Sequence, residues 1–373
     1  MEESIEQLTI LTINSGSSSL KASLFLTKGE RKNYRYEHID DHRAKNHAEA
    51  FATLLNDIKT DLPRDKTLII GHRFVHGGEI TDAARIIDAD ERARLESIIH
   101  LAPLHMPSNL LGVNLCSTHL SAQFNIVQIA CFDTAFHASM PEIAYRLPIP
   151  QSLNLRRFGF HGINYAHVTQ QLPKLLGKAA QGRIVIAHLG SGASLCLLEN
   201  LRSIDTSMGY TPAGGIPMGT RSGDIDPGVM LELAKRYTNS ELSTLIYQQM
   251  GLIELSDGEN SEMSALTESH SENAKFAVKY FARQVRAAIG AYAAKAGGID
   301  GLVFTGGIGE HSAHVRSLIC EPLAFLGFTL NEAANQVHSS ILNTLDSKPV
   351  LMIPADEEAE IARLTKAQYQ AQC

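Results

Sequence analysis

The stretch LTILTINSGSSSLKASLF (Leu8–Phe25) decides the fold. Leu8–Asn14 is apolar and rich in β-branched residues, which predicts a strand. A Ser/Gly turn follows at Ser15–Ser19, and Leu20–Phe25 alternates apolar and polar side chains, as the second strand of a hairpin does. The stretch therefore predicts a strand, a tight turn of small residues and a returning strand.

The same plan returns half a chain later. The apolar run RIVIAHL (Arg183–Leu189) leads into Gly190–Gly192, and Ala193–Leu198 is expected to be the returning strand. Asn14 and His188 hold equivalent places in the two stretches, 188 − 14 = 174 positions apart. One hairpin of this kind is common, but two copies half a chain apart indicate a duplicated α/β domain.

Four further apolar runs are expected to be strands that end at polar or glycine-rich segments. They are Thr67–Ile70, Asn125–Phe132, Gly301–Thr305 and Val350–Ile353. Polar groups just beyond the carboxyl ends of strands are where α/β sheets bind their ligands. Functional side chains are therefore expected at the ends of these four runs.

Helices are expected between the strands. One is predicted over Glu272–Ala296, ended by two glycines, with an apolar stripe at Phe276, Val278, Phe281, Val285 and Ile289. Two more are predicted to start near Pro107 and near Asp356. The charged segment Lys28–His47 is interpreted as a solvated loop, although His38, Asp40, Asp41 and His42 could imitate a metal cluster.

Composition limits the classes of function. The chain has 373 residues, of which 44% are hydrophobic and 20% charged, so it can bury one or two ordinary cores. A net charge of −7 makes nucleic acids and anionic membranes poor partners. Five widely spaced cysteines without a CxxC argue for a reducing compartment and against a disulfide framework or a zinc site. The polar start and the apolar runs, all short of about 18 residues, predict a cytoplasmic protein.

Three Gly/Ser turns follow apolar strands and could bind phosphate through their backbone N–H groups. They are Gly16–Ser19, Gly190–Gly192 and Gly306–Gly309. None fits the GxxxxGK[ST] pattern of a P-loop or the GxGxxG pattern of a dinucleotide fold. A tight hairpin explains any one of the turns, but the three together favour a nucleotide site.

Two arginines stand among glycines and other small residues. Arg73 lies in GHRFVHGGE (Gly71–Glu79), and Arg221 lies in MGTRSGDIDP (Met218–Pro227). Such neighbours leave room for the planar guanidinium to bind a carboxylate or a phosphate. A structural ion pair is the alternative for each arginine.

Three more side chains are candidates for the chemistry. His161, in FGFHG (Phe158–Gly162), could donate a hydrogen bond to a phosphoryl group, although a core histidine with satisfied hydrogen bonds is the alternative. Asp133 ends a predicted strand and Glu357 begins the last predicted helix. Carboxylates at such places suit Mg²⁺, although helix capping would also explain Glu357.

Nine ordered motifs, spread over nearly the whole chain, resemble those of the acetate kinase family. They are INSGSSSLK (Ile13–Lys21), GHRFVHGG (Gly71–Gly78), LAPLHMPSN (Leu101–Asn109), FDTAFH (Phe132–His137), GFHG (Gly159–Gly162), HLGSGAS (His188–Ser194), DTSMGYTP (Asp205–Pro212), MGTRSGDIDP (Met218–Pro227) and FTGGIGEHS (Phe304–Ser312). The resemblance implies the duplicated ribonuclease H-like α/β fold that is shared with actin, heat-shock ATPases and sugar kinases. It also implies a homodimer, and an active-site cleft between an N-terminal domain (1–135 plus 358–373) and a C-terminal domain (136–357).

The resemblance further implies the reaction and its residues. A phosphoryl group would pass reversibly and in line from ATP to acetate, with Mg²⁺ or alternatively Mn²⁺, giving acetyl phosphate and ADP. The implied catalytic residues are Arg73, Asp133, His161 and Arg221, and the implied metal-binding residues are Asn14, Asp133 and Glu357. The acid would be bound by Arg73, Val75, Leu104, Phe160 and Pro212. The nucleotide would be bound by Ser17, Ser19, Lys21, His188, Gly190, Ser191, Gly192, Glu262, Met263, Ser264, Gly307, Ile308, Gly309 and His311.

The nucleotide side departs from the family pattern. Ser191 and His311 stand where the family usually has Asn, and Glu262–Ser264 aligns with its usual Asp, aromatic and Arg. Another donor, such as pyrophosphate, is therefore an alternative to ATP. Propionate or another short acid is an alternative acceptor, because one methylene changes discrimination by only ~1–3 kcal/mol. A non-enzymatic nucleotide-binding protein is a third alternative. A hydroxyl kinase with Asp133 as the base is disfavoured, because a neutral sugar does not need two arginines.

Overall fold

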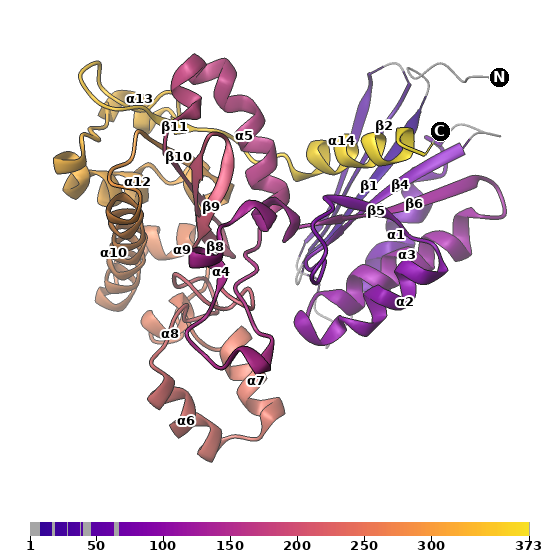
Figure 1. Ribbon diagram of the computed structural model, residues 1–373, viewed down its shortest axis with the longest axis horizontal. Helices are drawn as coiled ribbons and strands as arrows, with labels where there is room; N and C mark the ends of the chain where they lie inside the picture. Colours follow the sequence, from indigo (N-terminus) through magenta and orange to yellow (C-terminus); the bar gives the residue numbers. More distant parts are fainter. Residues whose placement is uncertain are drawn as a thin grey trace. The chain divides into compact units, whose positions relative to one another are not determined.

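A computed structural model of the protein describes residues 8–16, 19–27, 29–37, 39, 46–62 and 67–372. The chain forms two compact units. Unit 1 contains Met1–Phe136, Gly162–His167 and Asp356–Cys373, and unit 2 contains His137–His161 and Val168–Ala355. Each unit is built on its own β-sheet with helices packed against it (Figure 1).

The sheet of unit 1 has the strand order β3-β2-β1-β4-β6-β5. Its strands are β1 (Thr9–Ser15), β2 (Ser19–Phe25), β3 (Arg31–Glu37), β4 (Thr67–Phe74), β5 (Ala84–Ile86) and β6 (Asn125–Phe132). β1 is antiparallel to β2 and parallel to β4, and β4 is parallel to β6. The carboxyl ends of β1, β4 and β6 therefore lie at one edge of the sheet.

The sheet of unit 2 repeats this order as β11-β10-β7-β8-β9. Its strands are β7 (Ile184–Leu189), β8 (Ala193–Glu199), β9 (Arg202–Thr206), β10 (Gly301–Thr305) and β11 (Val350–Met352). β7 is antiparallel to β8 and parallel to β10, as β1 is to β2 and β4. The predicted duplication is confirmed, and Asn14 and His188 each stand one residue before the end of equivalent strands.

Both predicted hairpins close through a backbone hydrogen bond across the glycine turn. The N–H of Gly16 donates to the Ser19 carbonyl at 2.8 Å, and the N–H of Gly190 donates to the Gly192 carbonyl at 3.1 Å. Each of these hydrogen bonds thus lies at the end of the first strand of its sheet.

Alternating side chains of β1 divide the core of unit 1 between the two faces of the sheet. Leu11 and Ile13 pack among buried residues of α1 (His47–Ile58) and α3 (Met106–Leu120), and Ile10 packs with α14 (Glu357–Gln370). A Cβ at Gly71 of β4 would lie 2.1 Å from Thr365 Oγ1, so α14 approaches the strand closely. This packing fixes the start of α14 beside the sheet.

The remaining helices mostly belong to unit 2. The α-helices are α2 (Ala89–Ser97), α4 (Glu142–Tyr145), α5 (Gly162–Leu176), α6 (Pro227–Arg236), α7 (Asn239–Gln248), α8 (Leu252–Leu255), α9 (Met263–Glu268), α10 (Glu272–Lys295), α11 (Gly306–His311), α12 (Ala313–Cys320) and α13 (Glu332–Gln336). Short 3₁₀ helices span Ile99–Leu101, Ala135–Ser139, Gln151–Leu153, Gly177–Gln181 and Glu321–Leu326. Among the residues described, no helix is long and apolar enough to cross a membrane.

Three predictions need correction. The segment Lys28–His47 is not only a loop, because it contains β3 and the first residue of α1; its His38, Asp40, Asp41 and His42 lie outside the described residues. Phe276 is 55% exposed, because it lies two residues before Val278 and so on another face of α10. Gly306–Gly309 does not form a free turn but the first part of helix α11.

Candidate active site

In unit 1, the adjacent ends of parallel strands bring three polar side chains together. Asn14 comes from β1, Arg73 from β4, and Asp133 directly follows β6. The start of α14 adds Glu357 and Glu358. Parallel strands place such groups at a single edge, as expected for a ligand site in an α/β sheet.

Hydrogen bonds join these side chains into one network. Arg73 donates to Asp133 Oδ2 from Nε at 2.9 Å and from Nη2 at 2.6 Å, and Nη1 donates to Asn14 Oδ1 at 3.0 Å. Asn14 Nδ2 donates to Glu357 Oε2 at 2.7 Å and to Glu358 Oε1 at 3.0 Å. Arg73 Nη1 also lies 3.7 Å from Glu357 Oε2. The guanidinium therefore orients Asp133 and Asn14, and Asn14 orients the two glutamates.

Burial shapes the electrostatics of this cluster. Asp133 is fully buried, which raises the pKa of its carboxyl group, and the charge of Arg73 opposes that effect. Burial lowers the pKa of Arg73, but Asp133 and Glu357 outweigh it, so the pKa of the guanidinium lies above its ordinary value. One firmly charged guanidinium thus stands among the three carboxyl groups of Asp133, Glu357 and Glu358.

The cluster fits a hard divalent cation. The oxygen Asp133 Oδ1 is buried and has no hydrogen-bond partner of good geometry among the described residues. Carboxylate and amide oxygens are the ligands that Mg²⁺ prefers, and it is usually held by one or two carboxylates, waters and substrate phosphates. In the described part of the chain, no three His, Cys, Asp or Glu side chains form a closed metal cage. An open Mg²⁺ site suits these residues better than a metal site built from protein ligands alone.

In unit 2, His161 is held in an uncommon conformation. It precedes the first residue of α5 with φ +59°, a left-handed backbone that a non-glycine residue adopts at a cost of roughly 1–3 kcal/mol. Its Nδ1 lies 2.9 Å from Ser194 Oγ of β8, and its ring stacks on His188 with centroids 4.2 Å apart. The ring is thus fixed on two sides, and such maintained strain is typical of functional sites.

The glycine turn keeps a small space open beside His161 and Arg221. A Cβ at Gly192 would lie 3.2 Å from His161 Nε2 and 3.8 Å from Arg221 Nη1. Arg221 Nη1 donates to the Pro212 carbonyl at 2.9 Å, and the N–H of Gly219 donates to the Ser191 carbonyl at 3.2 Å. The loop that carries Arg221 is therefore tied to the turn, and the side chains of His161 and Arg221 both lie close to Gly192.

The predicted nucleotide residues of unit 2 divide into two groups. The turn at Gly190 adjoins α11, since a Cβ at Gly190 would lie 3.9 Å from the Gly307 nitrogen. Glu310 Oε1 accepts hydrogen bonds from the N–H groups of Gly306 and Ala355, both at 2.9 Å, and so fixes the start of α11. Ile308 and Gly309 lie in α11, and the side chain of His311 at its end is 77% exposed. Elsewhere, Glu262 and Ser264 are exposed while Met263 is buried at the start of α9.

The other predicted binding residues are distributed over both units. In unit 1, Ser19 and Lys21 are half-buried on β2, Ser17 lies outside the described residues, Val75 is buried after β4 and Leu104 is 39% exposed. In unit 2, Phe160 and Pro212 are buried.

Four residues that matter for this geometry were not predicted. They are Asn109, Ser194, Glu310 and Glu358. Asn109 accepts a hydrogen bond from the N–H of Val75 and donates to the Ser15 carbonyl, so it joins the ends of β4 and β1. Its place just after Pro107, at a predicted helix start, was an available signal. Glu358 could have been found beside Glu357, but the roles of Ser194 and Glu310 depend on contacts that no local pattern reveals.

Comparisons with known proteins give consistent results over nearly the whole chain. The sequence pattern of the Acetokinase family matches residues 9–363. An acetate kinase from Rhodopseudomonas palustris (strain TIE-1) is 38% identical over 389 residues, which cover 95% of this chain and 96% of the relative.

Solved structures agree with the sequence match. A propionate kinase from Francisella tularensis subsp. tularensis SCHU S4 superimposes with a TM-score of 0.84 at 29% identity, covering 96% of this chain and 99% of that one. Porphyromonas gingivalis acetate kinase gives a TM-score of 0.80 at 31% identity, with 97% and 100% covered. The resemblance inferred from the motifs is therefore confirmed in sequence and in fold.

Proposed function

Because the chain belongs to the acetokinase family, which makes it a phosphotransferase, we propose that it transfers a phosphoryl group reversibly between ATP and acetate, yielding acetyl phosphate and ADP. The observation that carries this proposal is the approach of His161 and Arg221 to Gly192 in the glycine turn. A hydrogen-bond donor and a guanidinium beside backbone N–H groups suit a phosphoryl group in transfer.

The chemistry needs charge neutralisation and not a general base. Acetate is ionised at pH 7 and is already a nucleophile. The obstacle is the repulsion between this anion and the phosphates. Arg221 and His161 oppose it by placing positive charge and donors where charge accumulates during in-line transfer. The buried hydrogen bond between His161 Nδ1 and Ser194 Oγ and the stacked ring of His188 keep the ring of His161 in position for that role.

Unit 1 would hold the metal and orient the acid. Asn14, Asp133 and Glu357 are the residues that we propose for Mg²⁺, directly or through water, and the ion would neutralise phosphate charge. Arg73 keeps Asp133 and Asn14 in place through its three hydrogen bonds. We also propose Arg73 as a partner for the carboxylate of the acid, with Val75, Leu104, Phe160 and Pro212 around its methyl group.

Propionate is the second candidate acceptor. The observation that favours it is the similarity to the propionate kinase of Francisella tularensis, which superimposes at least as well as the acetate kinase of Porphyromonas gingivalis. The proposed pocket is apolar, and one methylene alters discrimination by only ~1–3 kcal/mol.

The proposal is tested by trapping acyl phosphate with hydroxylamine. The purified protein is given acetate, propionate or butyrate with ATP, GTP or pyrophosphate in the presence of Mg²⁺. We expect acyl hydroxamate with acetate and ATP at the highest kcat/KM. A preference for pyrophosphate would instead connect the altered residues Ser191, Glu262, Met263, Ser264 and His311 with a different donor. No acyl phosphate from any pair would refute the proposed function.

We further propose that the enzyme acts in the cytoplasm as a homodimer. The four cysteines within the described residues are buried and unpaired, which suits a reducing compartment. Light scattering coupled to size-exclusion chromatography tests the dimer, and a monomeric mass at assay concentrations would refute it.

A further inference from the structure

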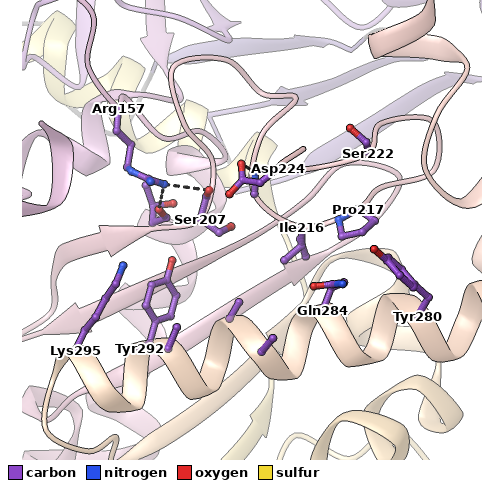
Figure 2. Close-up of a pocket in the computed structure, with 15 residues that line it drawn as sticks. Arg157, Ser207, Ile216, Pro217, Ser222, Asp224, Tyr280, Gln284, Tyr292 and Lys295 are labelled. Atoms are coloured by element: carbon purple, nitrogen blue, oxygen red, sulfur yellow. Dashed lines mark hydrogen bonds between the residues drawn. The ribbon is translucent and has the colours of Figure 1, made fainter. Parts of the chain in front are cut away.

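Unit 2 contains a cavity of about 340 Å³ that none of the residues proposed for the reaction lines. One wall is the loop between Thr206 and Asp224, and the floor is one face of α10 (Figure 2). This volume lies at the lower end of the range for small-molecule sites.

The floor of the cavity includes several small side chains of α10. Tyr280 and Tyr292 stand twelve residues apart, roughly 18 Å along a helix, and both line the cavity. Between them lies Gln284 (Figure 2), and the small residues Ala287, Ala288 and Ala291 of the same helix also line the cavity. A flat molecule can lie along this face without displacing a large side chain.

One end of the cavity is cationic. Lys295 and Arg157 line it beside Tyr292, and Tyr280 and Pro217 lie at the other end (Figure 2). Arg157 Nη1 donates to the carbonyls of Thr206, Ser207 and Met208, which anchors the guanidinium. Its Nη2 makes no hydrogen bond to the described residues, so it is available to an acidic group.

Two acidic side chains set limits on the ligand. Lys295 Nζ lies 2.5 Å from Asp205 Oδ2, but the lysine side chain is 56% exposed and has donors to spare. Asp224 also lines the cavity, and its Oδ1 accepts the N–H of Gly215 at 2.8 Å. An acidic group would therefore avoid Asp224 and bind at the end that Arg157 and Lys295 form.

The wall of the cavity belongs to the same loop as Arg221. Two hydrogen bonds between Gly215 and Asp224 close this loop, since the N–H of Asp224 also donates to the Gly215 carbonyl at 2.8 Å. Ile216, Pro217 and Ser222 of the closed loop line the cavity. Because Arg221 precedes Ser222, a ligand that contacts this segment would restrain the arginine.

We propose that this cavity binds a small flat molecule with one carboxylate or phosphate group, and that its occupant alters turnover by restraining the loop that carries Arg221. The binding does not depend on the reaction of the enzyme. The effect on turnover rests on the proposed function.

Binding is tested by saturation-transfer NMR on the full chain, with benzoate, phenyl phosphate and the neutral benzamide as probes. We expect both acids to bind at least tenfold more tightly than benzamide. The ratio of the dissociation constants of benzoate and phenyl phosphate tells whether a carboxylate or a phosphate is preferred. Ala291→Trp fills the floor at an exposed position, and Ala294→Trp adds the same side chain to α10 at an exposed position that does not line the cavity. Of the two tryptophan variants, only Ala291→Trp should abolish binding of the acids. Lys295→Gln should weaken their binding about tenfold.

Turnover is then measured at saturating acetate and ATP, so that an acid in the substrate pocket is displaced. The acid that binds should change kcat at least twofold in the wild type and in Ala294→Trp, but not in Ala291→Trp. Equal binding of the acids by both tryptophan variants would show that the probes bind outside the cavity, and would overturn the proposal. Tighter binding of benzamide than of the acids, or no binding of either acid, would also overturn it. A change of oligomeric state in Ala291→Trp alone would overturn it too, because the cavity would then be covered by a second copy. If binding follows the expected pattern while no acyl phosphate forms, only the proposed function fails.

Discussion

The substitution Gly192→Ala tests whether a phosphoryl group passes between His161 and Arg221. Gly192 does not have the left-handed φ that favours glycine, so alanine fits the backbone. Its methyl group would lie 3.2 Å from His161 Nε2, closer than a relaxed contact, and 3.8 Å from Arg221 Nη1, which is an ordinary contact. The histidine must therefore give way by a few tenths of an ångström, while the arginine stays.

The size of the effect follows from how firmly the ring is held. His161 is fixed by Ser194 at 2.9 Å and by the stacked ring of His188, so it moves only by weakening both contacts. A misplacement of about 1 Å costs about 100-fold in rate. The smaller shift, together with a methyl group in the space for the phosphoryl oxygens, should lower kcat by about 10- to 100-fold, or ~1.4–2.7 kcal/mol.

The assay compares kcat and the KM for acetate in the hydroxamate reaction, together with the melting temperature. The KM should change by less than about threefold, because the methyl group does not touch the residues proposed for the acid's methyl pocket. Gly290→Ala in α10 is the matched control, since a Cβ there meets no atom within 4 Å. A folded Gly192→Ala protein with wild-type kcat would refute the idea that the reacting group occupies this space.

Three further predictions concern the metal, the fold and pH. Glu357→Gln keeps an acceptor for Asn14 Nδ2 but removes a negative charge. The Mg²⁺ concentration for half-maximal activity should therefore rise roughly tenfold or more. An unchanged Mg²⁺ titration would contradict the proposed role of Glu357 at the metal. Gly71→Ala brings a methyl group within 2.1 Å of Thr365 Oγ1, so urea unfolding should show a loss of about 1–3 kcal/mol as α14 shifts, and undiminished stability would show that the helix is not packed as described. Burial lowers the pKa of His72, His76 and His137 to about 4 in the folded protein. In the unfolded chain, the pKa of each histidine is about 6.5. Stability should therefore be complete above pH 7 and fall by ~2 kcal/mol per histidine by pH 5, and a flat unfolding free energy over that interval would contradict the buried neutral state.

Elements whose side chains follow a local pattern could be predicted from the sequence. The apolar runs predict the observed bounds of β6 and β10, since Asp133 follows the first strand and Asp300 precedes the second. β3 was missed because charged residues dominate it. Its signal is the alternation of Tyr34 and Tyr36, which pack against the core of unit 1 and donate hydrogen bonds to Asp61 and Asp57.

Several residues of the candidate site could be predicted from the sequence, but the contacts that join them could not. Asn14 and Glu357 are 343 positions apart, and their hydrogen bond depends on how α14 packs on the sheet. The left-handed φ of His161 also has no local signature, because glycine and asparagine are the residues that usually indicate it. The local sequence therefore predicts which groups could react, while their orientation depends on contacts between distant segments.

The duplicated hairpin explains why the two units would act differently on one reaction. The residue one place before the end of the first strand is Asn14 in unit 1, where it pairs with Lys21, and His188 in unit 2, where it pairs with Ser194. The amide of Asn14 binds two carboxylates, which draws the first hairpin into a cluster suited to a cation. The ring of His188 instead stacks on His161, whose Nδ1 lies beside the hydroxyl of Ser194, so the second hairpin supports a donor for an anion. In the proposed function, one backbone plan would thus serve a metal in unit 1 and a phosphoryl group in unit 2, because the side chains at equivalent positions differ.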